Sequence, residues 1–266
     1  MSVDLNLDGR IIRGSGICGV VSQWDVGGGV LVRPCHGDRF IVLDDHRFIE
    51  NNGARRTAAE GSATPSGLTY QTPIDGRDLH FDNDRGTRRS YGMDGACADL
   101  RLSLNANQRL VFSWKFICDD GDGVANNNFA MVLVYDGAVP SPQAAPTIQQ
   151  ILATNPPEAP LLAGGRRLPF NAKTERLTEG RSTITPGNPR FRPDEWSTMR
   201  WTPGAGGFDG TIRWLVVSGW DVSQIRNSSE AEKKKPSRDE EQLMKQRAFP
   251  ATLLLDCIEI INDDGH

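Results

Sequence analysis

The sequence predicts an all-β protein: an antiparallel β-sandwich, or jelly roll, with two mostly irregular or short-helical insertions. Short apolar runs recur along the 266 residues, and several alternate between apolar and polar side chains, which is the pattern of a half-buried strand. Clusters of Gly, Asn, Asp and Pro separate the runs, and the 28 glycines and 16 prolines indicate many turns rather than long helices. Many short strands separated by turns favour a sandwich over a βαβ fold.

The predicted strands are rich in Val, Ile, Leu, Phe and Trp, and they span residues 30–32, 40–43, 100–104, 110–117, 129–135, 196–201, 211–218 and 251–261. In residues 110–117, one face carries only large apolar side chains, so we expect this face to pack in the core: Leu110, Phe112, Trp114 and Phe116. Residues 129–135 are apolar on both faces, which predicts a central strand that is covered on both sides. Trp214 alternates with apolar residues and is also expected in the core.

Two segments interrupt this pattern within what we expect to be a single domain, residues 1–266. Residues 136–195 are rich in Pro and Gly, and a capping threonine ahead of an apolar stripe predicts a short helix over residues 147–152. Residues 225–250 hold seven basic and five acidic residues, and a capping box predicts a short exposed helix over residues 237–246. Both segments are interpreted as insertions into the sandwich.

Charge and hydropathy exclude two classes of partner. The formal net charge of −4 argues against a nucleic-acid-binding protein, because such proteins usually carry a clustered positive face. No apolar run is long enough to span a bilayer. The first residues lack the charged and apolar regions of a secretory signal peptide, so we expect either a cytoplasmic location or export by a route without such a signal.

The five cysteines lie at positions 18, 35, 97, 118 and 257, with no C-x-x-C spacing. Buried free thiols in a reducing compartment are the simpler interpretation, and one or two disulfides remain open for an exported protein. The histidines do not pair with cysteines at the spacing of zinc ligands, and adjacent residues such as Cys35 and His36 are poorly placed to bind one metal together.

Asp256 is the candidate metal ligand. Alternation in the last predicted strand places it on a face with Thr252, Leu254, Ile258 and Ile260. A buried carboxylate without a partner is too costly to persist, so Asp256 must meet a cation, a set of amide donors or water. A structural calcium ion suits it, because calcium accepts carboxylates together with backbone carbonyls. The alternative is a strand-end aspartate that is hydrogen-bonded to a loop.

Candidate ligand-binding residues gather in one loop at positions 119–128: Asp119, Asp120, Asp122, Asn126, Asn127 and Asn128. Their oxygens suit either calcium or the hydroxyl groups of a sugar, although the spacing is not that of an EF-hand. Trp24 and Trp220 occupy turn or strand-end positions, where an indole ring can stack on a sugar. The alternatives are a solvated hairpin loop and tryptophans that cover the core.

Three blocks, GACADLRLSLNANQRLVFSWKFICDD, NNNFAMVLVYDG and ATLLLDCIEI, resemble the carbohydrate-binding-like jelly-roll domains of bacterial exported proteins. The similarity lies in a "G-S-A" turn at residues 95–97, "L-x-F-x-W-x-F" at 110–116, "N-D-F-A-F-V" at 128–130 and the closing "A-L-L-L-D-N-V" at 252–256. Residues 22–27 are similar to the "W-x-x-x-G" opening of these domains. The resemblance implies a β-sandwich that binds glycans or serves as an accessory module, with Asp256 as the ligand of a structural calcium ion.

The sequence therefore favours a non-catalytic carbohydrate-binding module whose partner is a glycan or polysaccharide. A structural or assembly protein is the alternative, such as a surface, appendage or phage-like component that uses the sandwich for protein contacts or homo-oligomers. A glycan hydrolase would need two carboxylates from different loops, such as Asp122 and Glu195, because neighbours on one loop rarely face each other across a cleft. The sequence also lacks a G-x-S-x-G, a phosphate-binding loop and an H-E-x-x-H.

Overall fold

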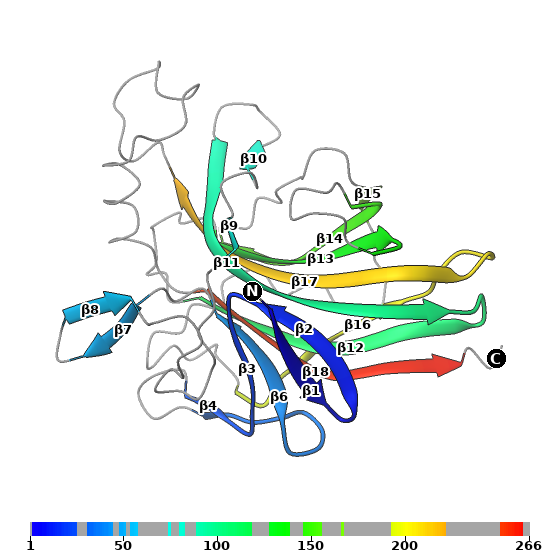
Figure 1. The fold of residues 1–266 in the computed structure, drawn as a ribbon, viewed down its shortest axis with the longest axis horizontal. Helices are drawn as coiled ribbons and strands as arrows, with labels where there is room; N and C mark the ends of the chain where they lie inside the picture. Colours follow the sequence, from blue (N-terminus) through cyan, green and yellow to red (C-terminus); the bar gives the residue numbers. More distant parts are fainter. Residues whose placement is uncertain are drawn as a thin grey trace.

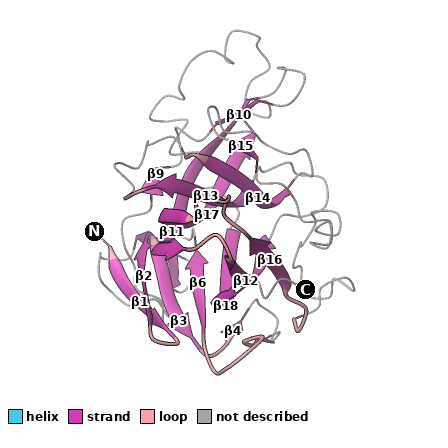
Figure 2. Cartoon of the chain, turned by 90° about the vertical axis from the view of Figure 1, so that its right-hand side faces the viewer, coloured by secondary structure: helices cyan, strands magenta, loops and turns pink. Residues whose placement is uncertain are grey.

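The computed structural model describes residues 2–25, 31–44, 48–51, 54–57, 74–75, 80–82, 89–118, 128–138, 146–155, 166–167, 193–221 and 251–262. Within these ranges the protein is all-β, and every regular element is a strand (Figures 1 and 2). The strands form two larger sheets and two separate two-stranded hairpins. This confirms the predicted all-β class, whereas the jelly roll stays a prediction and the described residues show no helical insertion.

The larger sheet has nine strands, and its main path runs β1-β2-β11-β17-β13-β14-β15. In that order the strands span Val3–Leu7, Arg10–Ser15, Arg89–Leu104, Phe208–Asp221, Asn128–Asp136, Ile148–Asn155 and Arg166–Arg167. Two short strands, β9 (Ile74–Asp75) and β10 (His80–Asp82), pair with β11 off this path. All pairs are antiparallel except that of β14 with β15, which is parallel.

The smaller sheet has five antiparallel strands in the order β16-β12-β18-β6-β3. They span Ser197–Trp201, Gln108–Cys118, Ala251–Asn262, Phe40–Asp44 and Ile17–Val21. Figure 1 shows β18 in red beside β12 and β6. The separate hairpins are β4 (Trp24–Asp25) with β5 (Leu31–Val32), and β7 (Phe48–Asn51) with β8 (Ala54–Thr57).

The two sheets share one hydrophobic core, the inner core, to which β11, β13 and β17 contribute from the larger sheet and β6, β12 and β18 from the smaller. Phe112 of β12 meets Trp214 of β17 edge to face, with ring centroids 5.3 Å apart. The predicted core face of β12 is confirmed, since all four of its side chains are buried: Leu110, Phe112, Trp114 and Phe116. The prediction for Trp214 is confirmed as well.

Strand β13 is buried on both faces, as predicted. Ala130, Val132 and Val134 lie in the inner core, whereas the intervening side chains lie in a second cluster on the other face of the larger sheet: Phe129, Met131, Leu133 and Tyr135. The strand pairs with β17 on one side and with β14 on the other. A strand in this position needs apolar side chains at every position, which explains the continuous run.

Gly16 is the corner at which the chain leaves the larger sheet for the smaller one. β2 ends at Ser15 and pairs with β11, and β3 begins at Ile17 and pairs with β6. Gly16 has a φ of +86°, and a Cβ atom there would lie 2.6 Å from the carbonyl oxygen of Gly95. Only glycine combines this conformation with so close an approach of two backbones.

The predicted helix over residues 147–152 is wrong, because residues 148–155 form strand β14 of the larger sheet. The apolar side chains of this segment fit either periodicity, and short apolar runs do not distinguish a strand from a helix. Pairing with β13 decides the outcome, and one extra residue of β14 opposite Ala130 and Met131 shifts the strand's alternation. The second predicted helix, over residues 237–246, lies outside the described residues.

Candidate functional site: a carboxylate and two thiols on the smaller sheet

The outer face of the smaller sheet is covered by the chain segment that includes β4, β5 and the approach to β6. A second hydrophobic cluster, the outer cluster, lies there and consists of Ile17, Trp24, Val32, Phe40, Val42, Ile117 and Leu254. Trp196 packs against this cluster, with its ring 5.6 Å from that of Phe40, and its indole N–H donates to the carbonyl of Arg33 over 3.2 Å. Residues 31–40 are thereby held against β12 and β18.

A β-bulge in β18 turns Cys257 toward this segment, next to Asp256, which regular alternation already places on the outer face with Leu254. Val111 of β12 pairs with Glu259, and Ser113 pairs with Asp256, so β18 has one extra residue between them. Cys257 has a φ of +50°, a conformation that a side-chain-bearing residue seldom adopts. Bulges of this kind re-aim side chains and are frequent beside functional sites.

The bulge corrects the predicted environment of Asp256. Leu253 and Leu255 before the bulge, and Ile258 and Ile260 after it, all pack in the inner core. Ile258 and Ile260 therefore do not share a face with Asp256, as uninterrupted alternation would require. The extra residue reverses the alternation of side chains between the two halves of β18.

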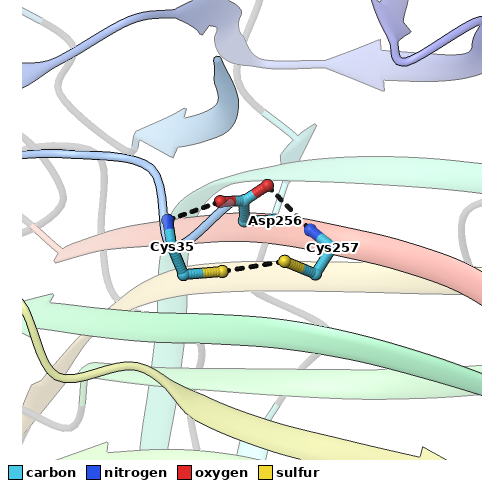
Figure 3. A group of neighbouring side chains, drawn as sticks. All are labelled: Cys35, Asp256 and Cys257. Carbon is cyan, nitrogen blue, oxygen red and sulfur yellow. Dashed lines mark hydrogen bonds between the residues drawn. The ribbon is translucent and has the colours of Figure 1, made fainter. Parts of the chain in front are cut away.

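Asp256 is completely buried, and its carboxylate accepts three backbone hydrogen bonds, of which those from Cys35 and Cys257 are drawn in Figure 3. Oδ2 accepts from the N–H of Cys35 over 2.7 Å and of His36 over 3.2 Å. Oδ1 accepts from the N–H of Cys257 over 2.7 Å. Of the three partners that the sequence left open, amide donors are the ones present, and hydrogen bonds of this charge-assisted kind compensate for lost water.

Two thiols lie beside this carboxylate. The Sγ atoms of Cys35 and Cys257 are 2.9 Å apart, and both thiols are free. Partial desolvation of the sulfur atoms raises the pKa of each thiol, and a hydrogen bond with Ser113 acts in the opposite direction. Figure 3 shows the two sulfurs facing each other below the Asp256 carboxylate.

Cys35, Asp256 and Cys257 each offer one possible metal-ligand atom, and these atoms lie within 4.8 Å of one another. Among the described residues, no other group of three or more His, Cys, Asp or Glu side chains is close enough to hold one metal ion. Two sulfurs and one carboxylate are a soft donor set, which suits metals that bind thiolates. Calcium instead takes about six to eight oxygen ligands. The described surroundings of Asp256 therefore do not fit calcium, and the calcium site stays a prediction.

Lys115 lies on the same outer face of β12, two residues from Ser113, and is 8% exposed. Burial lowers the pKa of Lys115 to about 8, although the charges of Glu195 and Asp194 act in the opposite direction. Its ammonium lies 6.0 Å from the ring centroid of Trp196. An amine with this pKa exchanges its proton near neutral pH, which an exposed lysine does not do.

The outer face of the larger sheet carries a different set of polar groups. Arg213 donates two hydrogen bonds to Asp99, over 2.7 and 2.8 Å, and its guanidinium lies 5.6 Å from the ring centroid of Tyr135. At the start of β17, Asp209 accepts hydrogen bonds from Arg101 and Ser103. These groups satisfy one another across neighbouring strands, which favours a structural role.

The remaining predicted site residues fall into two groups. Five lie outside the described residues: Asp119, Asp120, Asp122, Asn126 and Asn127. Asn128 begins β13 and Trp220 lies in β17. Trp24 is only 8% exposed and belongs to the outer cluster, which is the core role that the sequence left open for it. Glu195 is exposed just before β16.

The pairing of Cys35 with Cys257 is the feature that sequence reasoning missed. The two residues are 222 positions apart, and neither spacing nor composition links them. Asp256 was the one signal in the sequence. A buried carboxylate requires donors, so a second segment had to approach it, and therefore also Cys257, the next residue in the chain.

None of the described residues forms a helix that is long and apolar enough to cross a membrane. A scan against protein-family models, a search of curated proteins and a search of solved structures each found no match for this chain.

Proposed function

We propose that the chain is a non-catalytic binding module that uses a jelly-roll β-sandwich to bind carbohydrate. The inner core supports the sandwich, because its side chains come from both sheets and the Phe112–Trp214 contact bridges them. Two sheets that bury their facing sides against each other are the layers of this architecture.

The observation that carries the proposal is the strand register at one end of the larger sheet. Phe129 of β13 pairs with Val217 of β17, which brings Asn128 and Trp220 to the same end of neighbouring strands. In the chain, residues 119–127 connect Cys118 of the smaller sheet with Asn128 of the larger sheet. An amide and an indole, the groups that Asn128 and Trp220 carry, suit the hydroxyl groups and the apolar face of a sugar ring. The sequence adds the carboxylates and amides of residues 119–127 as further candidates.

A structural role for Asp256 is consistent with a non-catalytic protein. Its carboxylate is completely buried, and three amides occupy its oxygens, so it has no free path to a substrate. The residue instead fastens residues 35–36 to β18. The proposed function does not require calcium.

The test is a screen of the purified protein against a broad glycan array, once with calcium and once with a chelator. Wild type is expected to bind a defined class of sugar, and Trp220→Ala and Asn128→Ala should weaken binding at least about tenfold, the loss of one good stacking or hydrogen-bonding contact. Asp209→Asn is the matched control, because this exposed carboxylate lies at the opposite end of β17. Circular dichroism confirms that each variant is folded.

A blank array in both buffers contradicts carbohydrate binding. Equal loss of binding in Asp209→Asn and Trp220→Ala would instead show that the ligand does not bind at the proposed end. A blank array together with concentration-dependent oligomers in sedimentation would favour the assembly protein.

A further inference from the structure

We propose that Cys35 and Cys257 form a reversible disulfide, which fastens the segment that leads into β6 to the bulge of β18. The pair joins two parts of the chain that carry different elements, and it does not depend on the proposed carbohydrate ligand. Three observations carry the proposal: the position of the backbones, the distance between the sulfurs and the seclusion of two of the other thiols.

One side chain positions the backbones of both cysteines. The N–H of Cys35 and the N–H of Cys257 each donate to the Asp256 carboxylate over 2.7 Å, on different oxygens. Cys257 is also placed by the bulge, which gives it a φ of +50°. Ordering the two backbones before reaction removes most of the entropy that closing a long loop would otherwise cost.

The sulfur atoms are placed for a covalent bond with each other rather than for sharing a metal. They lie 2.9 Å apart, so a disulfide of about 2.04 Å needs an approach of roughly 0.9 Å, within the reach of small side-chain rotations. Two thiolates on one tetrahedral zinc ion, at Zn–S distances of about 2.3 Å, lie about 3.8 Å apart. A metal would also compete with the amides that already bind the Asp256 oxygens.

Access favours this pair over the buried thiols. Cys35 is exposed and Cys257 is half-buried, whereas Cys18 and Cys97 are buried. Cys18 lies in the inner core, and Cys97 lies in the cluster on the other face of the larger sheet. An oxidant in solution therefore meets Cys35 and Cys257 before either of these.

The oxidant is a low-molecular-weight disulfide, and the reaction is thiol–disulfide exchange. One protein thiol loses its proton to water, and its thiolate attacks a sulfur of the reagent, which expels the other half of the reagent as a thiolate. The second protein thiolate then attacks the protein sulfur of the mixed disulfide and releases the remaining half. The two cysteines lose two electrons and two protons, and the S–S bond of the reagent is reduced to two thiols.

The test equilibrates the folded full chain with glutathione buffers of increasing oxidised fraction, in the presence of a chelator. The experiment uses the Cys118→Ser variant, which removes one competing thiol. Wild type is treated in parallel. After alkylation of free thiols, peptide mapping by mass spectrometry is expected to find the Cys35–Cys257 linked peptide. Its amount should rise with the oxidised fraction and fall to zero with an excess of dithiol reductant.

Cys35→Ser and Cys257→Ser should each abolish the linked peptide, while Cys97→Ala should leave it unchanged. The proposal is overturned if both thiols stay alkylatable at every glutathione ratio, or if they link only in denaturant. A predominant link to Cys118 in wild type overturns it too. The proposal is also overturned if wild type, prepared without chelator, retains one equivalent of metal and Cys35→Ser does not. The thiols would then belong to a metal site.

Discussion

At the scale of single residues, Asp256 shows how the protein tolerates a carboxylate that has lost all contact with water. Burial of a charge is costly unless donors replace the lost hydration. Here the donors are N–H groups of Cys35, His36 and Cys257, so the compensation comes from two segments at once. The same contacts that stabilise the carboxylate therefore also order the loop and the bulge around it.

Asp256→Asn should lower the free energy of unfolding by about 2–4 kcal/mol, because the amide NH₂ group would face backbone N–H donors and leave buried donors without acceptors. Chemical denaturation followed by tryptophan fluorescence measures the loss. Asp209→Asn is the control, since that carboxylate is exposed, and it should cost much less. Equal losses in the two variants would mean that the amide contacts contribute little to stability.

Lys115 predicts a pH dependence of stability. Its pKa is about 8 in the folded protein and 10.5 in the unfolded chain, so between these values the unfolded chain binds more protons. The contribution of Lys115 to the free energy of unfolding therefore rises between pH 8 and 10.5, by on the order of 2 kcal/mol. Below pH 8 the lysine is charged in both states, and the full cost of burying that charge is present. Burial raises the pKa of Cys18 and Cys97 to about 12, and these thiols act in the opposite direction above pH 9.

A comparison with Lys115→Met isolates the lysine from the thiols. Urea unfolding of both proteins between pH 7 and 10 should show wild type gaining stability relative to the variant across the window. Parallel curves would mean that the pKa of Lys115 is not lowered.

At the scale of elements, two local departures from regular strand geometry decide where the site lies. The bulge in β18 brings Cys257 onto the outer face beside Asp256, and the corner at Gly16 passes the chain from one sheet to the other. Each departure depends on a neighbouring strand: β12 opposite the bulge, and β11 against the corner. Neither follows from the alternation of one strand by itself.

Gly16→Ala should destabilise the protein by about 2–4 kcal/mol, from the positive φ and from the clash of the new methyl group with the Gly95 carbonyl. Gly9→Ala is the matched control, because Gly9 has a φ of +81° and nothing lies within 4 Å of the point that its new methyl group would occupy. This variant should cost only about 1 kcal/mol, from backbone conformation alone. The difference between the two denaturation midpoints measures the close contact, and equal midpoints would contradict it.

At the scale of the whole molecule, the Cys35–Cys257 pair is a cross-link across most of the chain. The cysteines are 222 positions apart, so their disulfide closes a very long loop of the unfolded chain. In the chain-entropy description, a loop of this length stabilises the folded protein by up to about 5 kcal/mol, less any strain in the folded state. The oxidised protein should therefore unfold at a higher guanidinium concentration than the reduced protein.

The matched control for this comparison is Cys35→Ser, whose midpoint should be the same in oxidising and reducing buffer. An oxidised wild type that carries the linked peptide but shows no shift would mean that strain in the folded state cancels the entropic gain.

Much of the architecture could be predicted from short-range pattern. Alternation identified the core face of β12, and a continuous apolar run identified the double burial of β13. One carboxylate among apolar neighbours predicted the burial of Asp256. The hairpin of β1 and β2 was not among the predicted strands, although Asp8-Gly9 between two alternating runs signals a two-residue turn. That signal is local, because it lies in the turn residues themselves.

The sequence by itself determined the all-β class, the strands with strong alternation and the need of Asp256 for a partner, because side-chain periodicity and the cost of burying charge are local properties. Only the tertiary structure decided that residues 148–155 form a strand, that β18 carries a bulge and that Cys35 meets Cys257. These outcomes depend on pairing and register between segments far apart in the chain. Such contacts are selected by the packing of the whole molecule, and no single segment specifies them.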